Sequence, residues 1–150
     1  MKIRYYSLIV LLVMSVLAPM QAQTYDKMWK ELEVLEQKDL PQSVISEAMK
    51  IYDKAKAEQN VPQMMKAYLT TMQYRSLLTP DSLKVDMKGL EQWASQTGSV
   101  EDKAILYSIL GEMTMTDNIK KGFDYLQLSL KDKDKLLLVP VEKFKPMVKV

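Results

Sequence analysis

The sequence contains no cysteine and no histidine. Without a thiol or an imidazole, the chain cannot form a disulfide, a common zinc site, a cysteine nucleophile or a serine–histidine triad. It has only four glycines, at positions 89, 98, 111 and 122, which lie too far apart for a phosphate-binding loop. These absences exclude most familiar catalytic and metal chemistry, so we expect no enzymatic activity and no cofactor.

A strong excess of one sign of charge is also missing. The 21 basic residues outnumber the 19 acidic residues by two, and Lys2 and Arg4 account for that excess. The chain from residue 23 onward is therefore formally neutral. A nucleic-acid-binding protein normally carries a clear basic excess, so nucleic acid is not an expected partner.

The first 22 residues are typical of an export signal. A charged start is followed by an apolar stretch over residues 8–18 and by small residues suited to a signal peptidase. The apolar stretch is shorter than the roughly 20 residues of a membrane-spanning helix. We predict cleavage between Ala22 and Gln23, with Ala18 as the alternative cut point, and no transmembrane segment after cleavage.

From residue 24 onward, apolar residues recur at helical spacing, and proline, asparagine and glycine occur where one helix could end and another begin. Helix pairs starting near Thr24, Val61 and Ser99 are 37 and then 38 residues apart. Such a period is typical of helix-hairpin arrays. The sequence therefore predicts an all-α domain over residues 23–131, made of about three antiparallel helix hairpins like a tetratricopeptide-type α-solenoid.

Residues with known preferences for helix starts predict the helix boundaries. Pro41 and Pro62 are expected in the first turns of the second and third helices. Thr79 is expected to cap the fourth helix and Ser99 the fifth, and the sixth helix is expected to start near Asp117.

The apolar stripes also predict which residues form the core. Gly111 and Gly122 are expected to allow two helices to pack closely. A candidate concave binding face would come from the first, third and fifth helices, although no residue on it stands out. The residues expected to anchor the core are Trp29, Leu32, Ile51, Tyr52, Tyr68, Leu90, Trp93 and Phe123.

The end of the chain has a different composition. Residues 132–150 are apolar and basic, are broken by two prolines, and are expected to form an irregular tail that begins a missing segment. Aspartates at alternate positions suggest a calcium loop. However, Leu137 stands where that loop needs glycine, and Lys143 stands where it needs glutamate. A calcium loop is therefore excluded.

Several short motifs follow one another in a recognisable order. They lie at residues 25–29, 39–41, 51–52, 54–58, 61–63, 66–68 and 78–82, and continue at 89–93 and 125–133. In order and spacing they resemble the N-terminal segment of large exported alpha-2-macroglobulin-like proteins of Gram-negative bacteria. The resemblance covers most of residues 24–148, and each motif alone has low specificity.

Proteins of that family are long chains, built mostly of β-sandwich domains, that entrap or inhibit proteases. Some carry a cysteine–glutamine thioester, which this cysteine-free chain cannot form. The resemblance implies a non-catalytic helical module in the periplasm or cell envelope of a Gram-negative bacterium. Its partner would be the rest of a larger chain, a peptide or a protease.

Two other functions are compatible with the sequence. One is a stand-alone periplasmic adaptor whose groove holds a peptide or a partner helix. The other is a hydrolase whose only catalytic groups are a pair of aspartate or glutamate carboxylates, although the sequence singles out no particular pair.

Overall fold

The computed structural model describes residues 24–136, which form helices and contain no strand. The all-α fold class predicted from the sequence is confirmed. After a first helix over residues 24–37, the helices are α2 (Pro41–Ala57), α3 (Val61–Leu78), α4 (Ser82–Gln96), α5 (Val100–Met115), α6 (Ile119–Ser129) and α7 (Lys133–Leu136). The predicted cleavage site at Ala22 and Gln23 lies outside the described residues, as does the tail from residue 137.

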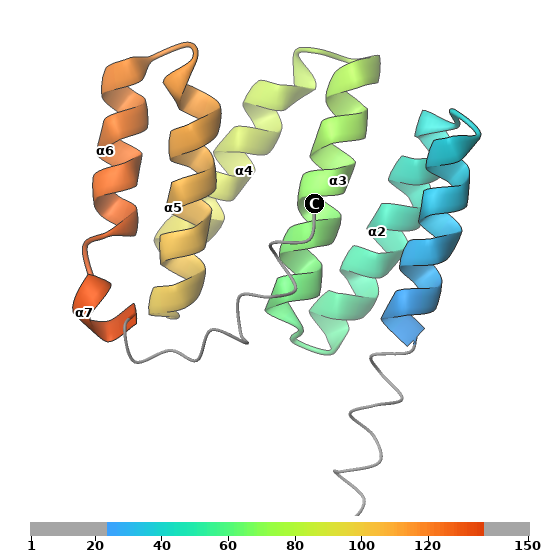
Figure 1. Ribbon diagram of the computed structural model, residues 1–150, viewed down its shortest axis with the longest axis horizontal. Helices are drawn as coiled ribbons and strands as arrows, with labels where there is room; N and C mark the ends of the chain where they lie inside the picture. The colour runs from blue at the N-terminus through green and yellow to red at the C-terminus, as the bar shows by residue number, and fades with distance from the viewer. Residues whose placement is uncertain (1–23, 137–150) are drawn as a thin grey trace, which may run out of the picture.

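Consecutive helices run up and down in one row, from the N-terminal helix and α2 at one end to α5 and α6 at the other (Figure 1). Packing along this row is uneven. Among the helices from α2 to α7, contacts are most extensive between α2 and α3 and between α5 and α6, and they are much sparser between α3 and α4. Figure 1 shows α4 tilted away from α3. The sequence predicts that α3 forms a hairpin with α4. In the structure α3 instead packs more closely against α2 than against α4.

Local capping chemistry explains most helix starts. Pro41 and Pro62 lie in the first turns of α2 and α3, as predicted. The Ser99 hydroxyl accepts a 3.2 Å hydrogen bond from the Asp102 amide at the start of α5. The Asn118 side chain accepts one of 3.0 Å from the Lys121 amide, so α6 begins beside Asp117 as expected.

The prediction that Thr79 caps α4 is wrong. The Ser82 amide donates a 2.9 Å hydrogen bond to the Thr79 carbonyl, and α4 begins only at Ser82. Residues 79–82 therefore form a turn with Pro80 at its second position, where the fixed φ of proline suits a turn as well as a helix start.

Buried apolar side chains form two clusters. The first joins the N-terminal helix, α2 and α3, and the second joins α3 to α6. Helix α3 belongs to both, because it places Ala67 in the first cluster and Met65 and Met72 in the second. A helix that packs on two sides needs apolar residues on both, which explains why α3 has no single apolar stripe.

Seven of the eight predicted anchors contact these clusters. Leu32, Ile51 and Leu90 are fully buried. Trp29 and Tyr52 pack against the first cluster, and Tyr68 and Trp93 pack against the second.

The prediction that Phe123 anchors the core is wrong, because 56 % of this residue is exposed. Helix α6 instead buries Gly122, Tyr125 and Ser129. Each helical residue turns by about 100° from the one before it, so Phe123 points away when Gly122 faces α5.

The close helix packing predicted at Gly111 and Gly122 is confirmed. A Cβ atom added at Gly122 would lie 3.0 Å from the Met115 Cα atom and 3.1 Å from the Gly111 carbonyl oxygen, both on α5. Both of these contacts are backbone atoms, which cannot move aside as a side chain can. A side chain at position 122 would therefore push α5 and α6 slightly apart.

The predicted irregular tail requires one correction. It was expected to begin at residue 132, but Lys133–Leu136 form the short helix α7. Hydrogen bonds from the Lys133 amide to the Leu130 carbonyl and from the Lys135 amide to the Asp132 carbonyl shape this last turn.

Candidate functional site

No helix within residues 24–136 is long and apolar enough to cross a membrane. Within the same residues, no three histidine, cysteine, aspartate or glutamate side chains are grouped so that they could hold a metal ion.

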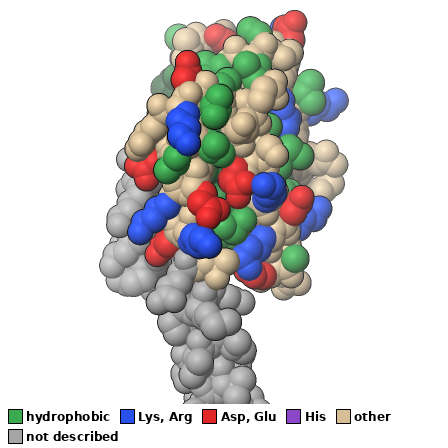
Figure 2. All heavy atoms as spheres, turned by 90° about the vertical axis from the view of Figure 1, so that its right-hand side faces the viewer, with side chains coloured by type: hydrophobic (Ala, Val, Ile, Leu, Met, Phe, Trp, Pro, Cys, Tyr) green, Lys and Arg blue, Asp and Glu red, His purple; other side chains and the backbone are tan. Residues whose placement is uncertain are grey.

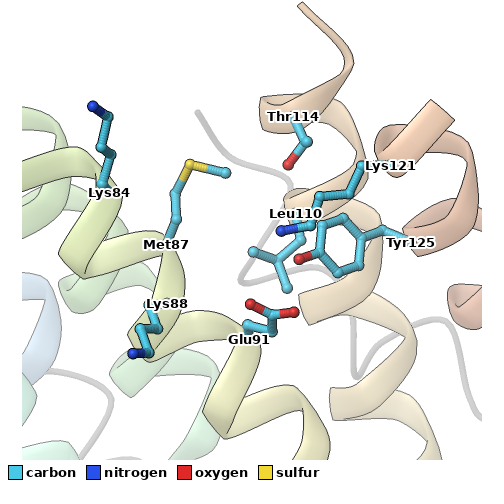
Figure 3. Close-up of a pocket in the computed structure, with 8 residues that line it drawn as sticks. All are labelled: Lys84, Met87, Lys88, Glu91, Leu110, Thr114, Lys121 and Tyr125. Carbon is cyan, nitrogen blue, oxygen red and sulfur yellow. The ribbon is translucent and has the colours of Figure 1, made fainter. Parts of the chain in front are cut away.

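A cavity of about 350 Å³ lies between α4, α5 and α6. Its apolar surface comes from Met87, Leu110 and Tyr125, one residue from each of the three helices (Figure 3). We call it the lysine-rimmed cavity, because it is also lined by Lys84, Lys88 and Lys121.

The charge around this cavity is mostly positive. Three lysines and one acidic residue, Glu91, line the cavity, and the Glu91 carboxylate lies close to the ring of Tyr125. The Lys121 ammonium group points toward these residues, whereas the ammonium groups of Lys84 and Lys88 point away from them (Figure 3). By contrast, the face formed by the N-terminal helix and α2 mixes both signs of charge with apolar side chains (Figure 2). The lysine-rimmed cavity therefore offers an electrostatic preference that this end face does not.

Tyr125 is held between two neighbouring side chains. It is buried, and its ring stacks on Tyr107 of α5 with ring centres 6.1 Å apart. The Lys121 ammonium group lies 5.2 Å from the centre of the Tyr125 ring on the same helix. Contacts on both sides hold the ring in place, so this wall of the cavity is preformed.

The polar groups around Tyr125 shift one another's protonation. Burial raises the pKa of Tyr125, and the nearby Glu91 carboxylate raises it further, while Lys121 works in the opposite direction. The hydrogen bond with Tyr125 raises the pKa of Lys121. Tyr125 is thus a neutral phenol and Lys121 a cation at neutral pH, which makes this group suited to binding and unsuited to proton abstraction.

Thr114 also lines this cavity. Its side-chain oxygen is buried and has no hydrogen-bond partner among the described residues. A buried hydroxyl without a partner is uncommon in folded proteins. The site thus combines positive charge with apolar surface.

The predicted site residues do not form this cavity. None of the eight predicted core anchors lines it. It also does not lie on the face that the first, third and fifth helices would form, since two of its three helices are α4 and α6. Seven of them belong to the packed core instead, and Phe123 is exposed.

A sequence signal for the cavity was nevertheless present. Lys84 and Lys88 are four residues apart on α4, and Lys121 and Tyr125 have the same spacing on α6. Residues four apart share a helix face, so each pair could be recognised as adjacent from the sequence. That the two pairs border one cavity depends on how α4 and α6 pack around α5.

Fold and site together define an all-α protein in which a row of helices carries a positively charged cavity. No protein-family model, curated protein or solved structure matches the chain. The resemblance to alpha-2-macroglobulin-like proteins therefore rests on the sequence motifs alone.

Proposed function

We propose that this chain is a non-catalytic, exported helical module that binds a segment of another protein. We further propose that it corresponds to the N-terminal part of an alpha-2-macroglobulin-like endopeptidase inhibitor. The export signal and the ordered sequence motifs support this assignment.

The lysine-rimmed cavity is the observation that best supports the binding role. Its apolar surface can cover an apolar side chain, and its lysines attract negative charge. The expected ligand is an acidic protein segment that also carries an apolar residue. Electrostatic attraction of this kind speeds association and weakens as salt is added.

Fluorescence anisotropy with two labelled peptides tests the binding role. One peptide alternates glutamate and leucine, and the other alternates lysine and leucine at the same length. Residues 23–150 should bind the acidic peptide more tightly, and added salt should weaken that binding. Equal affinity for both peptides would contradict the proposal.

A pair of matched variants locates the site. Lys121→Gln removes a charge from the cavity and should weaken binding of the acidic peptide several-fold. Lys56→Gln removes the same charge from an exposed position on α2 and should have little effect. Equal losses in both variants would show that the peptide responds to overall charge rather than to the cavity.

Two further measurements test the proposed export and the proposed family. When residues 1–150 are expressed in a Gram-negative host, N-terminal sequencing of the periplasmic fraction should give a chain that begins at Gln23. The coding DNA beyond codon 150 should encode macroglobulin-like β-sandwich domains in the same frame. A cytoplasmic product that retains Met1 would contradict export, and the absence of such domains would contradict the family assignment.

A further inference from the structure

Helix α6, at one end of the row of helices, leaves large apolar side chains exposed. Ile119, Phe123 and Leu130 are 64 %, 56 % and 62 % exposed. Single exposed apolar residues are normal on protein surfaces, whereas a contiguous apolar patch marks a place where something else packs. The arrangement of these three residues therefore decides what their exposure means.

Helical geometry places the three residues on one side of α6. Each residue of a helix turns by about 100° from the one before it, so positions 119, 123 and 130 lie within about 40° of one another. Leu130 directly follows α6 and keeps a helical backbone, so it continues the line. Leu126 is half-buried beside them toward α5, since a Cβ atom added at Gly111 would lie 2.7 Å from the Leu126 Cδ2 atom. We call Ile119, Phe123, Leu126 and Leu130 the α6 stripe.

The α6 stripe is separate from the lysine-rimmed cavity. None of its four residues lines that cavity, whereas Tyr125 of the same helix does. Tyr125 lies about 130° around the helix from the centre of the stripe. The stripe and the cavity are therefore on different sides of α6.

The polar border of the stripe carries one charge of each sign. On the side away from α5, the apolar residues are followed by Lys120, Asp124 and Gln127, all of them exposed. A strongly charged partner of either sign would gain little from this border. An occupant of the stripe is therefore selected by its apolar side chains.

A segment of this chain with that composition starts near the C-terminal end of α6. Helix α7 begins four residues after α6 ends, and Figure 1 shows it beside that end of α6. Residues 137–150 follow α7 directly, with the sequence LLVPVEKFKPMVKV. Eight of these fourteen residues are leucine, valine, phenylalanine or methionine, so the segment gains free energy by packing on an apolar surface.

The reach of this segment also fits the stripe. Helix α6 has 11 residues, and a helix of that length is about 16 Å long. An extended chain advances about 3.3 Å per residue, so about five residues span α6. Alternate side chains of an extended chain are about 6.6 Å apart, close to the roughly 6 Å between helical residues four positions apart. Leu137, Val139 and Val141 alternate in this way.

Two prolines favour an extended segment over another helix. Pro140 and Pro146 each disfavour helical backbone at the residue before them, which is Val139 or Lys145. Proline also lacks the N–H group that a helix interior needs. An extended segment packed on a helix through its side chains does not need those N–H groups.

We propose that residues 137–150 cover the α6 stripe of the same chain. The segment leaves α7 and runs in extended form from Leu130 toward Ile119, with Val141 and Phe144 against the stripe. This contact goes beyond the proposed peptide-binding role and does not depend on it, because it uses another side of α6. Failure of the acidic peptide to bind would leave it unaffected.

Photocrosslinking in residues 23–150 identifies what lies on the stripe. Phe123 is replaced with benzoylphenylalanine, which bonds to neighbouring C–H groups when irradiated. Mass spectrometry should find position 123 linked to a residue within 137–150, in a product with the mass of one chain. The same replacement at Val85 of α4, which is even more exposed, is the control and should give no such link.

Two crosslinking results would overturn the proposal. A product with the mass of two chains would show that a second copy covers the stripe. A product without any link to residues 137–150 would show that this segment lies elsewhere.

Urea unfolding tests whether the contact stabilises the fold. Phe123→Ser and Val141→Ser should each lower the unfolding midpoint, because each removes apolar surface from the contact. The double variant should show a smaller shift than the sum of the two single shifts, since residues in contact are not additive. Val85→Ser is the matched control, and its shift should add to that of Val141→Ser. Additive shifts for Phe123→Ser and Val141→Ser would contradict a direct contact.

Discussion

The Tyr25 hydroxyl donates a 2.6 Å hydrogen bond to the Glu58 Oε2 atom. Tyr25 lies near the start of the N-terminal helix, and Glu58 lies just after the end of α2. The Lys54 ammonium group also donates a hydrogen bond to Glu58. Residues 33 positions apart in the sequence are thus joined at the end of the row, where the N-terminal helix has a neighbour on one side only.

Replacing Tyr25 with phenylalanine should lower the free energy of unfolding by about 1–2 kcal/mol. The variant keeps the buried ring and removes a hydrogen bond to a charged acceptor. Urea unfolding followed by circular dichroism measures the change. Tyr107→Phe is the control, because the structure shows no hydrogen bond for that hydroxyl within residues 24–136, and an equal loss in both variants would contradict the prediction.

Stability should fall in acid as Glu58 becomes protonated. The hydrogen bond from Lys54, followed by that from Tyr25, lowers the pKa of Glu58 in the folded chain. Its contribution is therefore complete above the unfolded pKa of about 4.3 and is lost as the pH falls through the lower folded value. Urea unfolding at a series of pH values from 7 to 2 measures this loss.

The variant Glu58→Gln isolates that contribution. It should be less stable than the natural chain at pH 7, and the difference should shrink as the pH falls below about 4. Glu33→Gln, at an exposed position of the N-terminal helix, controls for the loss of one negative charge. A difference that stayed constant down to pH 2 would show that Glu58 does not act through its charge.

Gly122→Ala should destabilise the protein by about 1–3 kcal/mol, because the added methyl group meets the α5 backbone. Gly98→Ala is the matched control. Nothing lies within 4 Å of a Cβ atom added at Gly98, so this variant should be neutral or slightly more stable. Thermal unfolding compares the two, and equal midpoints would contradict the close α5–α6 contact.

Gln59→Gly should stabilise the protein by about 0.5 kcal/mol. Gln59 has a φ of 55°, in the left-handed region that glycine adopts without steric cost. Asp39 has a similar φ of 53°, but aspartate tolerates this region better, so Asp39→Gly should gain less. Urea unfolding of both variants tests the order, and a larger gain at Asp39 would reverse it.

Much of the local structure could be predicted because its causes are local. Pro41 and Pro62 begin helices because proline suits a first helical turn, and Ser99 caps α5 with its own side chain. Thr79 shows where such reasoning fails, since Thr79-Pro80-Asp81 suits both a turn and a helix start. Neighbouring residues alone do not choose between them.

The candidate sites were much less predictable. Phe123 and Tyr125 are both large aromatic residues on α6, two positions apart, and only the rotation of α6 against α5 decides that Tyr125 is buried. Asp86 lies among the apolar positions of α4, and its pairing with Arg75 depends on how α4 crosses α3. No local pattern contains that information.

The sequence by itself determined the all-α class and the positions of most helices. These features follow from backbone preferences and helical periodicity, which act over a few residues. Only the tertiary structure decided which helices pack closely, which aromatic side chains are buried and where the lysine-rimmed cavity lies. Those outcomes depend on contacts between residues far apart in the chain, such as Tyr25 with Glu58 and Arg75 with Asp86.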